Sequence, residues 1–324
     1  MEKKKAEKSK IWSVIGNLLM LIAIFYIAKY IYKENIDFGF LRYEGNIIAV
    51  IVLIALSSAN VFCLALAWKN NLELFAPDSD ISLKDAVWIC AKSNLARYIP
   101  GNVAHYASRN IIGTKYGLKQ KVMALASLTE LLLVTLVSGF IILMLMYQKV
   151  QIVIYELLGE RNNNLGSIVG IFLFFFLILI IVVSLFLCIK EKVRNLRLCV
   201  FKGAISLVIY FFYHSINLLV FGGMIIYVFK IGTLDQIVNL GGCYLIAWLI
   251  GMITPGAPGG IGIREYILLV LLRDTTEESM ILQMAVLMRM ITLGGDVLAA
   301  IEGILIHRIK DAKSETMVEN MLEK

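Results

Sequence analysis

Residues 46–68 read NIIAVIVLIALSSANVFCLALAW, an apolar run without a charged side chain. A helix of about 20 apolar residues crosses the ~30 Å hydrocarbon core of a bilayer. Comparable runs lie at 11–32, 122–147, 165–189, 203–229 and 283–306. Because helices satisfy all their backbone hydrogen bonds internally, such runs predict an all-α integral membrane protein.

The composition of the whole chain agrees with this prediction. Of the 324 residues, 59% are hydrophobic and 17% are charged. Soluble domains are about a quarter charged and less than half apolar. A soluble chain with this balance would leave large apolar surfaces in water, so we reject a large soluble enzyme.

Positive charge gathers between the apolar runs. The net charge is +7, and the two densest clusters are Lys3, Lys4, Lys5, Lys8 and Lys10, and Lys190, Lys192, Arg194, Arg197 and Lys202. Such clusters mark the cytoplasmic ends of spans and face anionic lipid headgroups. We therefore predict a multi-pass protein of the cell membrane with both termini in the cytoplasm, and no nucleic-acid partner.

The stretch 236–272 has to enter the membrane and return to the same side if this orientation holds. Its middle, residues 254–262, reads TPGAPGGIG, which a continuous helix does not tolerate. We expect a hairpin of two helices, 236–253 and 264–272, with a broken turn between them. The second arm is too short to span, which favours a re-entrant element.

A second interrupted element lies at 84–110, on the predicted cytoplasmic side. Residues 86–96 have a helical pattern, RYIPGN at 97–102 interrupts it, and a helix resumes at His105. Paired interrupted segments are typical of transport sites, since unwound backbone supplies polar groups at depth. The alternative is that Pro100 and Gly101 form a plain surface turn.

These two interrupted stretches resemble a known family, the lysylphosphatidylglycerol synthase transmembrane region, which is a flippase-like domain. Its first signature is similar to Arg97, Tyr98, Pro100, Gly101 and Asn102, with Arg109 following. Its second is similar to Pro258, Gly259, Gly260, Gly262, Arg264 and Glu265. The resemblance implies about eight transmembrane segments, re-entrant elements included, that move lipid-linked or aminoacylated phospholipid between leaflets.

The resemblance covers a polytopic membrane domain at 1–306. The remaining stretch, 307–324, is predicted to be a short cytoplasmic tail and does not have room for the soluble lysyltransferase half of the full-length family members. The resemblance therefore implies a stand-alone form, with a separately encoded synthase or glycosyltransferase as a possible partner.

Ionisable side chains inside apolar runs are costly, which makes them candidates for function. Glu130 lies in 122–147, while Arg289 and Asp296 share one face of 283–306. His214 and Asn217 belong to a polar stripe with Tyr210 and Tyr213 at helical spacing. For each, a structural role in holding helices together is the alternative.

The charges suggest how an anionic headgroup would be held. Backbone N–H groups of the glycine run and the start of the helix after it form an anion site, where Arg264 would grip phosphate. Arg97 and Arg109 would do so on the cytoplasmic side. Asp296 needs a cationic partner, for which Arg289, Arg264 and Arg109 are candidates. The carboxylates would balance arginines, bind a lysyl group or relay protons.

The function favoured by these features is a flippase-like transporter of an anionic, aminoacylated or polyprenyl-linked lipid. One alternative is a membrane enzyme, and against it stand the lack of an aspartate-rich metal motif and of a Ser-His-Asp arrangement. Another is an accessory subunit of a lysyltransferase or lipid glycosyltransferase. We expect no metal, no cofactor and no catalytic residue, and an oligomer is possible.

Overall fold

The computed structural model describes Gly39 and residues 44–98, 104–158, 196–254, 258–260 and 262–322. Every regular element in these ranges is a helix, as predicted for the fold class. Five of the helices are long and apolar enough to cross a membrane. The predicted spans 11–32 and 165–189 lie outside the described residues, so the count of about eight segments stays a prediction.

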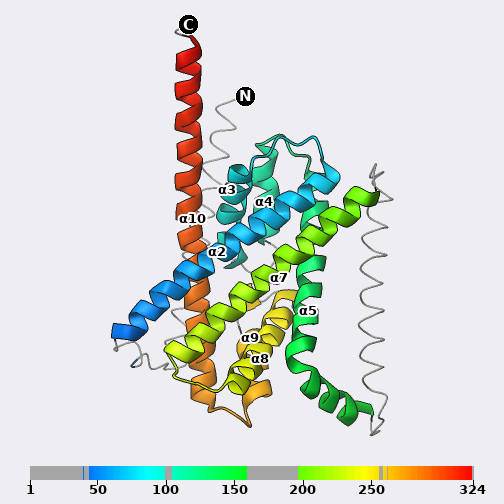
Figure 1. Cartoon of the computed structure of the whole chain (residues 1–324), viewed down its shortest axis with the longest axis vertical. Helices are drawn as coiled ribbons and strands as arrows, with labels where there is room; N and C mark the ends of the chain where they lie inside the picture. The colour runs from blue at the N-terminus through cyan, green and yellow to red at the C-terminus, as the bar shows by residue number, and fades with distance from the viewer. Residues whose placement is uncertain are drawn as a thin grey trace.

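The five long helices correspond to five predicted segments. They are α2 (Glu44–Phe75), α5 (Gln120–Leu158), α7 (Leu196–Tyr227), α8 (Leu234–Ile253) and α10 (Glu278–Leu322). The apolar part of α10 ends at His307, close to the predicted end at 306, while the helix itself continues to Leu322. Figure 1 shows this C-terminal part extending beyond the other helices.

The packing of α2 against α7 leaves a broad apolar face outside the bundle. The two helices run antiparallel across the front of the molecule in Figure 1 and contact one another along their length. Ile48 and Ile51 of α2 and Val200 and Phe212 of α7 are exposed. Large exposed apolar side chains suit a lipid-facing surface, because lipid tails are as apolar as these residues.

The predicted hairpin at 236–272 is present. Helix α8 is followed by the 3₁₀ turn η3 (Pro258–Gly260) and the short helix α9 (Ile263–Leu272), which packs back against α8. With 10 residues, α9 is only about 15 Å long and does not cross a bilayer. The helix bounds agree with the predicted arms to within a few residues.

The second interrupted element is also a hairpin. It consists of α3 (Leu83–Asn94), the 3₁₀ turn η2 (Leu95–Tyr98) and α4 (Ala104–Thr114). Ser82 begins α3 as its N-cap, accepting a hydrogen bond from the backbone N–H of Asp85 at 3.2 Å. Helix α3 ends two residues before the predicted 96, because the chain tightens into η2.

The two hairpins enter the bundle from opposite ends and meet at their turns. In Figure 1, α3 and α4 lie at the end where α2 finishes, whereas α9 finishes where α10 begins. The turns η2 and η3 are in contact. At Gly259 a side-chain carbon would lie 3.7 Å from the Tyr98 ring and 3.9 Å from the Arg97 carbonyl oxygen. The two turns therefore lie within ordinary van der Waals distance of each other.

Small residues let α10 pack closely on its neighbours. A side-chain carbon at Gly295 would lie 2.6 Å from Ser57 Oγ and 3.0 Å from the Ser57 backbone carbon in α2. At Gly303 it would lie 3.2 Å from Cβ of Ala91 in α3. Helix α10 therefore supports both α2 and the α3 hairpin.

We predict that Gly295→Ala destabilises the protein by about 1–3 kcal/mol, because the added methyl group has to push the Ser57 backbone away. The matched control is Gly203→Ala in α7, where nothing lies within 4 Å, and where alanine favours the helix. Thermal unfolding in detergent, followed by tryptophan fluorescence, measures both. Equal melting temperatures for the two variants would contradict the close packing of α10.

Candidate functional site

Asp296 of α10 holds the turn η2. Its carboxylate accepts hydrogen bonds from the Tyr98 hydroxyl at 2.8 Å and from Asn94 Nδ2 at 3.4 Å. The Arg97 Nη1 atom lies 3.6 Å from Asp296 Oδ2. Asp296 is buried, so these groups supply the compensation that a buried carboxylate needs.

The predicted partners of Asp296 were wrong. Arg289 and Arg109 pair with other carboxylates, and Arg264 forms no ion pair with a described residue. Arg97 takes this role because η2 brings it onto α10 beside Asp296.

Arg289, two helical turns before Asp296 on α10, holds the turn η3. Its guanidinium pairs with Glu265 through Nε, and through Nη2 at 3.1 Å to Oε2. It also donates to the backbone carbonyl oxygens of Gly260 at 2.9 Å and Gly259 at 3.3 Å. Its side chain lies inside the bundle and does not reach outward to the membrane surface.

The glycines of the second signature are required by backbone conformation. Gly259, Gly260 and Gly262 have φ values of 54°, 74° and 83°, a region that residues with a side chain rarely adopt. The N–H of Gly262 donates to Glu265 Oε2 at 2.7 Å. Pro258 begins η3, so the signature builds a turn whose carbonyl oxygens face Arg289.

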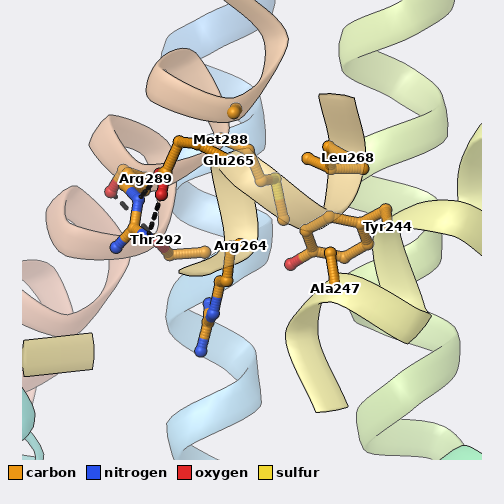
Figure 2. Close-up of a pocket in the computed structure, with 9 residues that line it drawn as sticks. Tyr244, Ala247, Arg264, Glu265, Leu268, Met288, Arg289 and Thr292 are labelled. Atoms are coloured by element: carbon orange, nitrogen blue, oxygen red, sulfur yellow. Dashed lines mark hydrogen bonds and ion pairs between the residues drawn. The ribbon is translucent and has the colours of Figure 1, made fainter. Parts of the chain in front are cut away.

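Arg264 has no ion-pair or hydrogen-bond partner among the described residues. Its stem passes between Gly251 and Gly260, where an added side-chain carbon would lie 2.6 Å from Arg264 Cγ and 2.8 Å from Nε, respectively. Nε is buried without a hydrogen-bond partner, and the guanidinium forms no hydrogen bond or ion pair with any described residue. Figure 2 shows Arg264 extending away from the Arg289–Glu265 pair.

A small cavity lies beside Arg264. Figure 2 shows Tyr244 with its hydroxyl group on the Arg264 side of this space. The residues that line it are Tyr244, Ala247, Arg264, Glu265, Leu268, Ala285, Met288, Arg289 and Thr292. About 20 Å³ is open to the centre of a water molecule, which is room for about one water. In this conformation the cavity is too small for a lipid headgroup.

Arg109 and Glu130 form a separate buried pair. Arg109 Nη1 lies 2.6 Å from Glu130 Oε2, and both side chains are almost fully buried. The guanidinium also lies over the rings of Trp68 and Tyr106, at 5.5 and 5.8 Å from their centroids. Arg109 therefore ties α4 to α5. Its predicted contact with phosphate on the cytoplasmic side stays a prediction, and in this structure its guanidinium pairs with Glu130.

His214 and Asn217 do not join the other candidates. The His214 Nε2 atom lies 3.0 Å from the backbone carbonyl oxygen of Val134, and its ring packs edge-on against Trp248. Asn217 donates to the carbonyl oxygen of Tyr213, one turn earlier, at 3.0 Å. Their contacts fit the alternative of a structural role. Pro100, Gly101 and Asn102 lie outside the described residues.

His105, in α4 and outside the five long helices, lies near two of the arginines. Burial, and then the charges of Arg97 and Arg109, hold the pKa of His105 well below its ordinary value. The imidazole is therefore neutral at physiological pH.

Sequence reasoning missed two residues around the two turns. Asn94 donates to Asp296, and Tyr244 lines the cavity. Nothing in the pattern of 236–253 distinguishes Tyr244.

Comparison with models of known protein families finds no match, and comparison with curated proteins finds none either. The resemblance of the two signatures to the flippase-like domain therefore stays a prediction. Among the described residues, no group of three or more His, Cys, Asp or Glu side chains is placed to hold a metal ion.

We predict that Glu130→Gln destabilises the protein by about 3–5 kcal/mol, because it leaves the Arg109 charge buried without a counter-ion. Thermal unfolding in detergent measures the change. The control is Asp274→Asn, which breaks the exposed pair with Arg273 and should change stability little. A Glu130→Gln variant as stable as this control would show that Arg109 is solvated or paired elsewhere.

Proposed function

We propose that this protein is a flippase-like transporter of the cell membrane, which binds a lipid headgroup between its two interrupted hairpins and moves it between the leaflets. Interrupted helices meeting at depth are the arrangement that known transporters use to expose polar backbone inside a membrane. The contact between η2 and η3 supports the proposal. So do the five apolar helices around it.

The observation that carries the proposal is the unpaired charge of Arg264. Around the two turns, Arg97 and Arg289 each have a carboxylate partner, whereas Arg264 has none among the described residues. Arg264 is half-buried, and its Nε atom is fully buried without a hydrogen-bond partner. A charge held inside a membrane protein without a counter-ion is costly, and such groups are candidates for acting on a ligand. An anionic headgroup would supply the missing charge.

The small cavity beside Arg264 has to open before the protein can bind a headgroup there. Because the space beside Arg264 admits about one water, the present conformation is closed to a headgroup. Transport then requires η2 and η3 to separate. That separation would break the hydrogen bonds from Tyr98 to Asp296 and from Arg289 to Gly260.

The proposed transporter has the membrane orientation and the class of lipid that were predicted from the sequence. Both termini lie in the cytoplasm, and the hairpin α3–α4 opens to that side. The lipid is an anionic or aminoacylated phospholipid or a polyprenyl-linked lipid, supplied by a separately encoded synthase or glycosyltransferase. The resemblance of the two signatures supports this choice of lipids.

We predict that Arg264→Gln slows lipid translocation at least about tenfold, since one charge-assisted contact to phosphate is worth about 1.5–3 kcal/mol. The assay follows a fluorescent phosphatidylglycerol from the inner to the outer leaflet of proteoliposomes, by dithionite quenching. Empty liposomes give the background rate.

The matched control is Arg273→Gln, which changes an arginine that is 73% exposed in the loop after α9. It should translocate lipid at the wild-type rate. If wild-type protein accelerates translocation of no lipid above the empty-liposome rate, the proposed function is wrong. If Arg264→Gln and Arg273→Gln are equally active, Arg264 is not part of the path.

A further inference from the structure

Of the buried ion pairs in the described part of the chain, Arg97–Asp296 is the loosest. The nearest atoms of this pair are 3.6 Å apart, beyond a good charge-assisted hydrogen bond. Arg109 and Glu130 approach to 2.6 Å, and Arg289 binds Glu265 through two nitrogens. The Arg97 side chain is also 27% exposed, against 0% for Arg109 and 10% for Arg289.

Asp296 does not depend on Arg97 alone. The Tyr98 hydroxyl and Asn94 Nδ2 donate to its two oxygens at 2.8 and 3.4 Å. Arg97, by contrast, makes no hydrogen bond to a described residue. The carboxylate therefore keeps two donors when Arg97 turns away, whereas Arg97 would need another anion.

Arg97 and Arg264 lie on either side of the contact between the two turns. The turn η2, which bears Arg97, touches η3. An added side-chain carbon at Gly259 would lie 3.9 Å from the Arg97 carbonyl oxygen, and one at the next residue, Gly260, would lie 2.8 Å from Arg264 Nε. Both arginines thus belong to the junction of the hairpins, and of the two only Arg97 pairs with Asp296.

We propose that these two arginines form a phosphate-binding site, in which a phosphate group takes the place of Asp296 at Arg97 while Arg264 grips it from the η3 side. Arginine suits phosphate because its planar fork donates two parallel hydrogen bonds. While the site is empty, the negative charge of Asp296 balances the positive charge of Arg97. Asp296 therefore competes with the phosphate group for Arg97.

This assignment rests on the proposed function only for the source of the phosphate, a lipid headgroup. Free phosphate offers the same chemistry. The charge count of the site, two arginines against one carboxylate, favours a ligand with net negative charge over a zwitterion. The site therefore selects phosphatidylglycerol over phosphatidylcholine.

The test is equilibrium binding to the full chain in detergent, by native mass spectrometry with dioleoyl phosphatidylglycerol and dioleoyl phosphatidylcholine as probes. Arg97→Gln and Arg264→Gln should each weaken phosphatidylglycerol binding about tenfold or more. Asp296→Asn should tighten it, because the competing charge is gone while the amide still accepts from Tyr98. If Asp296 had only a structural role, Asp296→Asn would not tighten phosphatidylglycerol binding.

A second variant covers the case in which Asp296→Asn does not fold. Tyr98→Phe removes a donor from Asp296, which then holds Arg97 more strongly, so lipid binding should weaken with both arginines intact. Arg273→Gln, on the exposed loop, should bind as wild type does. The site is wrong if Arg97→Gln or Tyr98→Phe binds phosphatidylglycerol like wild type, if Asp296→Asn weakens binding, or if phosphatidylcholine binds equally well.

Competition with sodium phosphate distinguishes the sources of the ligand. Displacement of the lipid by millimolar phosphate, lost in Arg97→Gln, would support the site with free phosphate as a ligand. No displacement would support the lipid headgroup as the ligand. If the variants change phosphatidylglycerol binding as predicted but the protein translocates no lipid in proteoliposomes, the binding site is supported and the transport function is rejected. If the protein translocates lipid but the variants do not change binding as predicted, only the binding site is rejected.

Discussion

The need to compensate buried charge on α10 organises the interior of this protein. Arg289 and Asp296 lie two turns apart on one face of a helix that is otherwise apolar there. Neither charge is tolerable inside the bundle without partners. Arg289 finds them in the turn η3 and at Glu265, and Asp296 finds them in η2. Helix α10 thereby fixes both interrupted hairpins.

Arg289 and Asp296 of α10 carry opposite charges, so the two turns that contact them offer different groups. The turn η3 offers outward-facing carbonyl oxygens to Arg289, which its glycines make possible through positive φ angles. The turn η2 offers Asp296 a hydrogen bond from the Tyr98 hydroxyl and the positive charge of Arg97. The interrupted backbone of both turns is therefore held by side chains of α10.

Hydropathy and turn residues predicted most of the architecture. The uncharged run at 46–68 required a long helix, and the Pro-Gly stretch at 254–262 required a break, because both follow from local physical chemistry. The hairpin at 236–272 followed from the alternation of charge across spans.

The ion-pair partners were not predictable in the same way. Pairing depends on how each helix is rotated and how deep each hairpin enters, which are long-range properties of packing. Arg109 was expected to hold phosphate on the cytoplasmic side, and in the structure it is buried against Glu130. Arg97 was expected to do the same, and in the structure it lies 3.6 Å from Asp296. Tyr244 belongs to a helix with no pattern that marks it.

The most direct test of this account is a cryo-electron microscopy map of the protein in nanodiscs that contain phosphatidylglycerol. The account predicts that η2 and η3 meet beside α10, with the Arg289 side chain against the carbonyl oxygens of Gly259 and Gly260. It also predicts headgroup density next to Arg264 whenever the turns are apart. A map in which η2 and η3 lie on opposite surfaces of the bundle, with ordered headgroups only at the outer face of α2 and α7, would contradict it.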